Sequence, residues 1–543
     1  MPSFQLCSTD GRGYLIPLED KPITIGRHPD NMLPLADEAA SRYHAVIELK
    51  KGGRVVVRDL GSRNGTKVNS TKLIKDELEV DAGATIRIGA HTFAIEAEHT
   101  LEEVRQQVRG RTIDTDTAWA DELRGLLLGL PPKGEGDDPV GLIDADGKSS
   151  SALSGNAPGP MALRMTLLLA GKSRATDVHI EPKLGKYTIR YRVDGQMLFI
   201  CDLPEKVGQL VLGVSRAAAQ MQQSGNDAVQ DGRFGVKFKN RKVDYRVSIT
   251  PSVHGAKLVL RVLDSANSPR SLTDLGLPTY MHERLRKVCT KEQGFVLVCG
   301  PTGSGKTTTL YNALREIDRE TTNIVTIEDP VEYQLEGVTQ IPIDEARGNT
   351  FKELLRSVLR QDPDVILVGE IRDEETARTA MQAAITGHLV FSTVHSKDSI
   401  SAVFRVLDLK VEPFLVASSL DIAIAQRLVR QLCEVCKKPI RVTPGQATKM
   451  GRYLDGKHEV NTPVGCAACL RTGYRGRRAI YEMLEFTDEL RDVILTTPTI
   501  QDMRRVVERG VFTTLLNAGW RCAAQGHTDL DEVERVVGGG SSM

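Results

Sequence analysis

The chain has 543 residues, too many for one hydrophobic core, so we expect three or four domains. Hydrophobic residues make up 40% and charged residues 26%, which is ordinary for a soluble globular protein. The 71 basic side chains equal the 71 acidic ones, so the composition does not favour nucleic acid as a partner. The apolar runs are too short to cross a bilayer and the amino terminus lacks a signal-peptide pattern, which together predict a cytoplasmic protein.

The first 98 residues predict an all-β domain. Short apolar runs such as ITIG, AVIEL and TIRIG alternate with turns of Gly, Asn and Asp, as in a sandwich or barrel. Residues 99–160 are predicted to be a linker that contains helical segments, LEEVRQQV and ADELRGLLLGL. Its second half, residues 131–160, is dense in Pro, Gly, Ser and Asp, which indicates flexibility.

Two further domains are predicted after the linker. Residues 161–268 begin with a helical pattern, MALRMTLLLAGKS, and continue with strand patterns, which indicates a small α+β domain. Over residues 269–537 apolar strands alternate with helices, as in a largely parallel α/β sheet. The tail GGGSSM is expected to be unstructured.

GPTGSGKT at 300–307 matches the phosphate-binding pattern G-x-x-x-x-G-K-[ST]. The strand pattern FVLVCG precedes it and the helical pattern TTTLYNALREI follows it, so backbone N–H groups would surround phosphates at a helix N-terminus. We expect Lys306 to reach the β- and γ-phosphates of ATP and Thr307 to hold Mg²⁺; a glycine-rich turn without a ligand is the alternative. The residues predicted to bind nucleotide are Gly300, Pro301, Thr302, Gly303, Ser304, Gly305, Lys306, Thr307 and Thr308.

Carboxylates and histidines follow or flank other strand patterns, where a nucleotide-hydrolysing site needs them. TIEDPVEY supplies Glu328, and the buried run VILVGE ends in Glu370, a Walker B arrangement with Glu in place of Asp. His388 and His395 flank the run LVFSTV. A lone histidine on an apolar strand is usually a core residue, but two beside a nucleotide loop favour contact with the γ-phosphate.

Four of the nine cysteines form two C-x-x-C pairs. This spacing predicts a tetrahedral Zn²⁺ site, and four thiolates leave no position for water, so the metal would be structural. Free or redox-active thiols are the alternative, and the odd cysteine count argues against a disulfide framework. The other five cysteines are expected to be core or surface residues. The predicted zinc ligands are Cys433, Cys436, Cys466 and Cys469.

From about residue 161 to 535, these boxes resemble the ATPases of type II secretion and type IV pilus assembly. ATDVHIEP at 175–182, IRYRVDG at 189–195 and QDGRF at 230–234 are similar to the family's signatures in the smaller domain. The resemblance implies a RecA-like ATPase domain with a zinc-binding subdomain at about 430–480, preceded by an N2-like α+β domain. It implies a homohexamer that binds ATP between these two domains and works on an inner-membrane platform protein and other pilus or secretion components.

The same resemblance implies roles for three acidic and histidine side chains. Glu328 would orient or deprotonate the attacking water, Glu370 would hold Mg²⁺ through water, and His395 would sense the γ-phosphate. The chain would be peripherally associated with the inner membrane. Because retraction-type pilus ATPases generally lack the tetracysteine motif, its presence favours assembly or export.

Four arginines match family positions near the nucleotide. Arg246 and Arg261 correspond to arginines of the smaller domain, and Arg356 and Arg360 to a pair on the ATPase domain. A guanidinium that reaches the γ-phosphoryl oxygens in the transition state can raise turnover by about 10³-fold or more. A surface ion pair is the alternative for each of them.

ITIGRHPDN, SRYHAVIEL and VRDLGSRNGTKVN, in that order within residues 1–98, resemble a forkhead-associated (FHA) domain. The resemblance implies a β-sandwich that binds phosphothreonine peptides through loops at one end, although a degenerate fold without this activity is an alternative. Arg27 would pair with the phosphate, Ser41 would hydrogen-bond it, and Asn64 would hold the peptide backbone. Arg42, Ser62 and Arg63 would add donors.

Other residues of these FHA motifs are expected to be structural. His44 would brace the loop that carries Ser41, and Asn64-Gly65 would form a tight hairpin. Asn69 is also expected to have a structural role.

The chain is therefore predicted to hydrolyse ATP at one phosphate site and to read a signal at the other. The family's usual N-terminal docking domain is not recognisable, so threonine phosphorylation of a partner or of this chain would control recruitment. Thr112, Thr115 and Thr117 lie beside acidic residues and are candidate tethered ligands, but a plain solvated linker is favoured. A phosphopeptide-binding scaffold with a vestigial ATPase and a nucleic-acid translocase are the alternative functions.

Overall fold

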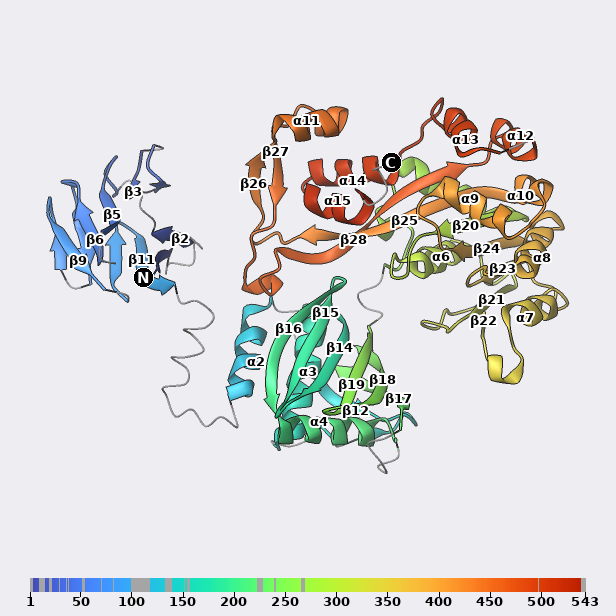
Figure 1. The fold of residues 1–543 in the computed structure, drawn as a ribbon, viewed down its shortest axis with the longest axis horizontal. Helices are drawn as coiled ribbons and strands as arrows, with labels where there is room; N and C mark the ends of the chain where they lie inside the picture. Colours follow the sequence, from blue (N-terminus) through green and yellow to red (C-terminus); the bar gives the residue numbers. More distant parts are fainter. Residues whose placement is uncertain are drawn as a thin grey trace. The chain divides into compact units, whose positions relative to one another are not determined.

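The chain forms two compact units, Met1–Ala118 and Trp119–Met543, in a computed structural model (Figure 1). No helix among the described residues has both the length and the apolar character that a membrane span requires. The structure describes residues 3–8, 15–18, 22–28, 30–35, 37, 39–50, 54–69, 71–81, 83–98, 118–131, 139–150, 152–153, 157–221, 228–238, 241–264, 269–496 and 498–538.

The first unit is a sandwich of a six-stranded and a five-stranded sheet, which confirms the predicted all-β fold. Alternate residues of the strands face inward: Ile23, Ile25 and Ile47 from one sheet share a core with Ile86 and Phe93 from the other. The six-stranded sheet contains β1 Ser3–Ser8, β2 Leu15–Leu18, β7 Thr66–Val68, β8 Thr71–Leu73, β10 Thr85–Ile88 and β11 His91–Glu98; the five-stranded sheet contains β3 Ile23–Gly26, β4 Leu33–Pro34, β5 Ala45–Lys50, β6 Arg54–Asp59 and β9 Glu77–Val80.

The turn at Asn64-Gly65 is not the predicted hairpin. β6 pairs with β5 and β9, whereas β7 pairs with β8 and β10, so the segment between β6 and β7 crosses from one sheet to the other. Gly65 has a φ of 74°, and a Cβ there would lie 2.8 Å from the carbonyl oxygen of Leu73. The glycine is required by this close crossing and not by the twist of a hairpin.

The second unit begins with a small α+β domain built on an eight-stranded antiparallel sheet. α3 and α4 pack on the sheet, where Leu163 and Val211 of the helices meet Val178, Ile189 and Leu258 of the strands in one core (Figure 1). The elements are α2 Ala118–Gly129, β12 Pro139–Ile143, β13 Ser149–Ser150, α3 Pro158–Ser173, β14 Ala175–Lys183, β15 Lys186–Val193, β16 Gln196–Pro204, α4 Glu205–Ala218, β17 Gln230–Phe238, β18 Lys242–Ser252 and β19 Gly255–Leu263.

Part of the predicted linker belongs to this domain. The helix expected from ADELRGLLLGL is α2, and its Trp119 and Leu123 are buried in the domain core. The prediction of a flexible linker is wrong for β12 and β13, because β12 pairs with β17 and buries Leu142. A few apolar residues were enough to extend an open sheet edge despite the polar composition around them. The helix expected from LEEVRQQV lies outside the described residues.

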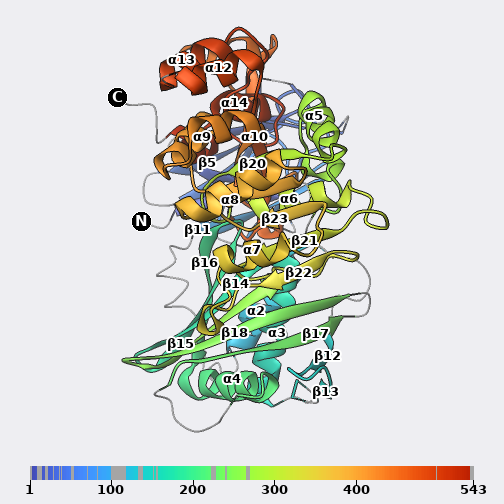
Figure 2. The same ribbon diagram turned by 90° about the vertical axis from the view of Figure 1, so that its right-hand side faces the viewer.

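The remainder of the second unit is built on a seven-stranded sheet in the order β22-β21-β23-β24-β20-β25-β28. All neighbours pair in parallel except β25 and β28, which confirms the predicted α/β class. Strand residues alternate between two cores: Leu297 faces the core formed with α8, α9 and α10, and Val296 faces the core formed with α5 and α6 (Figure 2). The carboxyl ends of β20, β21, β23 and β24 therefore meet at one edge, where such sheets bind ligands. The elements up to β25 are α5 Thr279–Cys289, β20 Gly294–Cys299, α6 Lys306–Arg315, β21 Ile324–Glu328, β22 Thr339–Pro342, α7 Phe351–Val358, β23 Val365–Val368, α8 Glu374–Ile385, β24 Leu389–Val394, α9 Ser399–Asp408, α10 Pro413–Ser419 and β25 Leu420–Leu432.

A hairpin subdomain is inserted between β25 and β28, and a group of helices ends the chain. The buried Arg430 of β25 forms an ion pair of 2.6 Å with Glu532 of α15, which fastens the last helix to the sheet. These elements are β26 Lys438–Arg441, α11 Pro444–Met450, β27 Glu459–Thr462, η5 Ala467–Cys469, β28 Tyr474–Glu485, α12 Asp488–Thr496, α13 Ile500–Val507, α14 Leu515–Ala524 and α15 Leu530–Val537.

Candidate nucleotide site, cysteine cluster and phosphopeptide loops

The predicted phosphate loop connects β20 to α6, and a buried glutamine of β25 holds it. Gln426 donates from Nε2 to the carbonyl oxygen of Ser304 (2.7 Å) and accepts at Oε1 from the hydroxyl of Thr309 (2.7 Å). A Cβ at Gly305, where φ is 88°, would lie 2.8 Å from that Nε2 atom. The loop therefore needs glycine there because β25 packs directly against it. Sequence reasoning missed Gln426, since AIAQRLV indicates only a strand.

Lys306 lies at the start of α6 and folds its ammonium back over the loop. Its Nζ donates to the carbonyl oxygens of Gly300 (2.9 Å) and Pro301 (3.2 Å). Burial lowers the pKa of Lys306, and the nearby carboxylate of Glu370 partly offsets that effect. Arg427 adds a second cation near the loop, where it donates to the carbonyl oxygen of Gln426 (2.9 Å). Sequence reasoning did not identify Arg427 either.

Glu370 and His395 lie at the carboxyl edge of the sheet, after β23 and β24 respectively. The His395 Nε2 atom is 3.4 Å from the Glu370 Oε2 atom, and Glu370 also pairs with Arg372. His388 lies at the opposite edge, because it precedes β24, and its Nδ1 atom is 3.0 Å from the carbonyl oxygen of Ala383. A six-residue strand separates the two histidines by about 20 Å, so the expectation that both contact a phosphate is wrong for His388.

Glu328, the last residue of β21, is 4% exposed and its carboxylate is held by three donors. The hydroxyl of Thr326 (2.6 Å) and Nε2 of Gln340 (3.1 Å) donate to Oε1. The hydroxyl of Tyr311 donates to Oε2. The strand end thus places Glu328 at the predicted edge, but its environment is more enclosed than the sequence indicated.

The four predicted arginines make no hydrogen bond or ion pair with Lys306, Glu370 or His395 among the described residues. Arg246 of β18 donates to the carbonyl oxygen of Val331 (2.9 Å) and so joins the α+β domain to the ATPase domain. The other three have partners within their own domains. Arg261 pairs with Asp177 at 3.2 Å, Arg356 pairs with Glu375, and Arg360 donates to the carbonyl oxygen of Arg356 (2.8 Å).

The four clustered cysteines come together between β25 and β28. Their Sγ atoms all lie within 4.8 Å of one another. The Cys433–Cys466 and Cys436–Cys469 pairs are 3.9 Å apart. Zn–S bonds of about 2.3 Å in a tetrahedron place the sulfur atoms about 3.8 Å apart, so the donor set fits that ion. The N–H of Gly473 donates to the Cys469 sulfur (3.2 Å), which favours its thiolate form.

The remaining cysteines are consistent with the expected core positions. Cys201, Cys289, Cys299 and Cys522 are buried. The side chain of Cys7 lies outside the described part of the chain.

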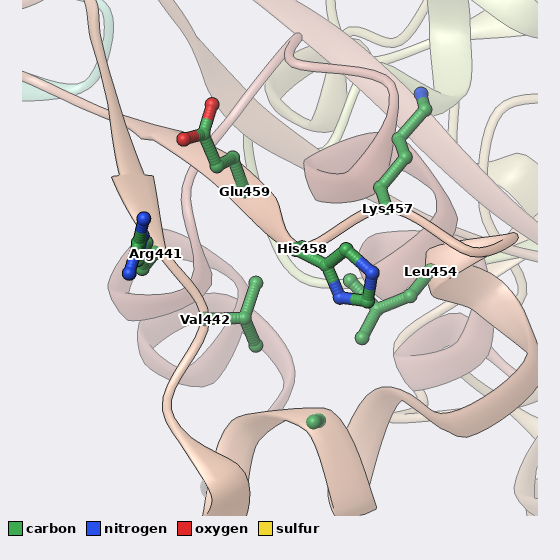
Figure 3. Close-up of a pocket in the computed structure, with 7 residues that line it drawn as sticks. Arg441, Val442, Leu454, Lys457, His458 and Glu459 are labelled. Carbon is green, nitrogen blue, oxygen red and sulfur yellow. The ribbon is translucent and has the colours of Figure 1, made fainter.

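A surface cavity of about 780 Å³ opens in the hairpin subdomain (Figure 3). No predicted site residue lines it, so it is separate from the nucleotide site and the cysteine cluster. Its lining residues are Arg441, Val442, Ala447, Leu454, Lys457, His458 and Glu459.

Buried polar side chains shape the FHA loops. Asp59 accepts hydrogen bonds from the hydroxyls of Ser62 and Thr66 (2.7 Å each) and from the N–H of Lys75 (3.0 Å). These donors lower the pKa of Asp59 to about 2, against the opposing effect of burial. The predicted role of Ser62 as a phosphate donor is wrong, because Ser62 is buried and its hydroxyl proton is directed to Asp59.

Three loops meet at the predicted phosphopeptide end, and hydrogen bonds join them. The N–H of Arg27 donates to the carbonyl oxygen of Ser41 (2.9 Å), and Nδ2 of Asn64 donates to the carbonyl oxygen of Ala39 (2.8 Å). The Ser41 hydroxyl oxygen accepts from the N–H of Arg63 (3.0 Å), which leaves its own proton to donate. Each of the three loops carries an exposed arginine: Arg27, Arg42 and Arg63.

The buried side chains of His44 and Asn31 hold the loops through hydrogen bonds. His44 is fully buried; its Nδ1 accepts from the N–H of Ser41 (3.0 Å), and its Nε2 lies 3.3 Å from the carbonyl oxygen of Gly65. This confirms the expected bracing role, and burial lowers the pKa of His44, which favours the neutral ring. Asn31, which sequence reasoning missed, donates to the carbonyl oxygen of Arg42 (2.7 Å).

Asn69 also has the expected structural role. It adopts a φ of 50°, and its side-chain oxygen accepts from the N–H of Thr85 (2.8 Å). It therefore ties the end of β7 to β10.

With its phosphate loop, lysine and acidic strand end at one edge of a parallel sheet, the second unit is a P-loop ATPase. Residues 153–535 match the family model described as "Type II/IV secretion system protein", and the chain belongs to this family. Residues 23–89 match the FHA domain model, so an FHA domain precedes the secretion ATPase.

Relatives with established names support this assignment. The type II secretion system protein E of Aeromonas hydrophila is 38% identical over 455 residues, which cover 81% of this chain and 90% of the relative. The type IV pilus assembly ATPase PilB of Myxococcus xanthus is 40% identical over 382 residues, covering 70% and 68%. The ATPase DotB of Legionella pneumophila has a similar fold, with a TM-score of 0.53 and 22% identity over 69% of this chain and 95% of that one.

Proposed function

We propose that the chain converts ATP hydrolysis into mechanical work for the assembly of a type IV pilus or a type II secretion pseudopilus. The names of the relatives and the geometry around Lys306, Glu370 and His395 support this role. The working form would be a homohexamer at the cytoplasmic face of the inner membrane, peripherally bound to a platform protein and its associated components. Nucleic acid is not expected as a partner.

We assign the nucleotide to the loop of residues 300–308. Lys306 would exchange its bonds to loop carbonyl oxygens for the β- and γ-phosphates, while the loop N–H groups hold the rest. Thr307 and Glu370 would hold Mg²⁺, which neutralises phosphate charge when bound. His395 would sense the γ-phosphate, and Glu328 would orient or deprotonate the attacking water.

The arginines are proposed to act after a domain movement. Arg246 already contacts the ATPase domain, and Arg261 is 62% exposed although paired with Asp177. Together with Arg356 and Arg360 they would approach phosphate charge when the two domains close on ATP within the hexamer. Such a dependence on closure would couple hydrolysis to motion.

We propose that the cysteine cluster holds a structural Zn²⁺. Its four thiolates complete a tetrahedral shell and leave no position for substrate. The metal would stabilise the junction between β25, the hairpin subdomain and β28.

We propose that the FHA domain recruits the ATPase through a phosphothreonine. Arg27, with Arg42 and Arg63, would neutralise the dianion, Ser41 would donate to it, and Asn64 would hold the peptide backbone. The ligand would be a phosphorylated protein of the secretion machinery. The candidate ligands within this chain, Thr112, Thr115 and Thr117, lie outside the described residues.

ATP turnover by the purified full-length chain with Mg²⁺ tests the proposal. Lys306→Ala is expected to abolish turnover, because no other described side chain places an ammonium over the loop, while phosphothreonine-peptide binding persists. Lys291→Ala, a surface ion-pair lysine in the same domain, is the matched control and should leave turnover unchanged. A wild-type oligomer that binds phosphopeptide but fails to hydrolyse ATP, even with membrane components supplied, would instead support a scaffold with a vestigial ATPase.

A further inference from the structure

Among the described residues, three donors contact the Glu328 carboxylate, which leaves one acceptor position. An ionised carboxylate offers about four lone-pair positions on its two oxygens. Thr326 and Gln340 occupy two on Oε1, and Tyr311 occupies one on Oε2. The carboxylate is 4% exposed, so bulk water does not compete freely for the remaining position.

The Tyr311 hydroxyl is the donor in its hydrogen bond with Glu328, because an ionised carboxylate can only accept. Gln340 Nε2 lies within hydrogen-bond distance of the Tyr311 oxygen (3.2 Å), of Glu328 Oε1 (3.1 Å) and of the Tyr333 carbonyl oxygen (3.2 Å), so its two protons are shared among three acceptors. Burial and the adjacent carboxylate raise the pKa of Tyr311 well above its ordinary value, which keeps the phenol protonated. The fully buried ring is held edge-on against Tyr333, with centroids 4.7 Å apart.

Tyr311 and Lys306 belong to the same helix. They are five positions apart on α6, which corresponds to a rise of about 7.5 Å along the helix axis. A helix is rigid over this length, so the end that would hold the phosphates and the residue that holds Glu328 move together. Through the hydroxyl of Tyr311, a shift of the phosphate loop therefore also shifts the Glu328 carboxylate on β21.

We propose that Tyr311 is a positioning residue for ATP hydrolysis: its hydroxyl orients the Glu328 carboxylate so that the free acceptor position on Oε2 receives the attacking water. Tyr311 touches neither ATP nor the water. The inference rests on the role proposed above for Glu328 and adds the residue through which the phosphate-loop helix controls it.

Tyr311→Phe tests the inference in the full-length chain, since it keeps the ring and removes only the oxygen. We expect kcat for ATP to fall about tenfold to 100-fold, part of the contribution of a general base, with KM for ATP changed less than about twofold. Tyr333→Phe is the matched control. The Tyr333 ring packs against Tyr311, but its hydroxyl makes no hydrogen bond to Glu328, so the kcat of this variant should equal that of the wild type.

A double-mutant cycle with Glu328→Gln separates positioning from general destabilisation. If Tyr311 acts through the carboxylate, Tyr311→Phe has no further effect on kcat once Glu328→Gln is present. The thermal transition shows whether Tyr311→Phe folds. If it does not, Gln340→Met replaces it in the cycle, because the Gln340 amide donates to both the Glu328 carboxylate and the Tyr311 oxygen. The same non-additivity is then expected.

Three results would overturn the inference: unchanged or increased kcat in Tyr311→Phe, an equal loss in Tyr333→Phe, or fully additive effects with Glu328→Gln. An increased kcat would mean that Tyr311 sequesters the carboxylate instead of orienting it. These results leave the proposed function intact as long as the wild type hydrolyses ATP and Lys306→Ala does not. A wild type without turnover contradicts the proposed function itself.

Discussion

The two predicted phosphate sites of this chain differ in the origin of the side chains that shape them. In the FHA domain, Asp59 organises the turn after β6 through donors no more than 16 positions away. In the ATPase domain, Gln426 holds the phosphate loop from a strand 122 positions beyond Ser304. Both supports are nearly fully buried. The FHA loops are therefore largely a product of local sequence, whereas the phosphate loop depends on the assembled sheet.

The largest expected effect concerns ligand binding by the FHA domain. Arg27→Ala should weaken binding of a phosphothreonine peptide about 100-fold, which corresponds to about 2.7 kcal/mol, because a charge-assisted contact to the dianion is lost. Titration of the full-length chain measures the affinity. Arg54→Ala, a surface residue paired with Glu79, is the control and should bind normally. ATP turnover should be equal in all three proteins, and a loss in Arg27→Ala would show that the sites are coupled.

Asp59→Asn tests the local support of the FHA loops. The unfolding free energy of this domain should fall by about 1–3 kcal/mol, because buried donors lose a charged acceptor. Hydrogen exchange of β5 and β6 amides in the full-length chain measures the loss, and α/β-sheet amides provide the internal reference. Asp81→Asn, at an exposed position of the same domain, should change nothing. Equal losses in the two variants would contradict the assigned role of Asp59.

Gln426→Leu tests the long-range support of the phosphate loop. ATP affinity should fall about tenfold, or about 1.4 kcal/mol, because the Ser304 carbonyl and the Thr309 hydroxyl lose their buried partner. Nucleotide titration measures it, and phosphopeptide affinity should not change. Gln431→Leu on the same strand is the matched control, since no hydrogen bond joins it to the loop. If both variants bind ATP normally, the loop holds its shape without β25.

The last prediction is a pH dependence confined to the FHA domain. The folded pKa of Asp59, about 2, lies below its ordinary value of 3.8, so its stabilising effect is complete above about pH 4 and is lost as the pH falls through 2. In Asp59→Asn this dependence should be absent. Exchange of the β5 and β6 amides between pH 4 and pH 2 compares the two proteins, and parallel pH profiles would exclude Asp59 as the titrating group.

The sequence predicted the elements that carry short, dense patterns. GPTGSGKT between an apolar strand and a helix, and two C-x-x-C pairs, each indicate a chemistry because glycine and cysteine are needed at fixed spacings. The same reasoning failed where a polar residue acts at a distance. Gln426 and Asn31 lie in ordinary strand and loop patterns, and Ser62 has the residue type of a phosphate donor but is directed inward.

Two further predictions depended on the polarity of a segment and on the position of a residue relative to a strand. β12 lies in a segment whose composition indicated a linker, because pairing with an existing sheet edge requires few apolar residues. His388 and His395 have similar sequence surroundings, yet the direction of β24 places only His395 at the site edge. Which end of a strand faces the ligand follows from the parallel sheet and not from the histidine.

The amino-acid sequence by itself determined the order of the domains, the parallel and antiparallel classes of their sheets, and the residue types at both predicted phosphate sites. These depend on hydrophobic periodicity and on glycine, cysteine and arginine at short spacings, which are local properties of a chain. Only the tertiary structure decided the enclosure of Glu328 by Tyr311, Thr326 and Gln340, and the support of the phosphate loop by Gln426. Hydrogen bonds between buried groups from distant strands have no periodic signature, because they exist only after the sheet has assembled.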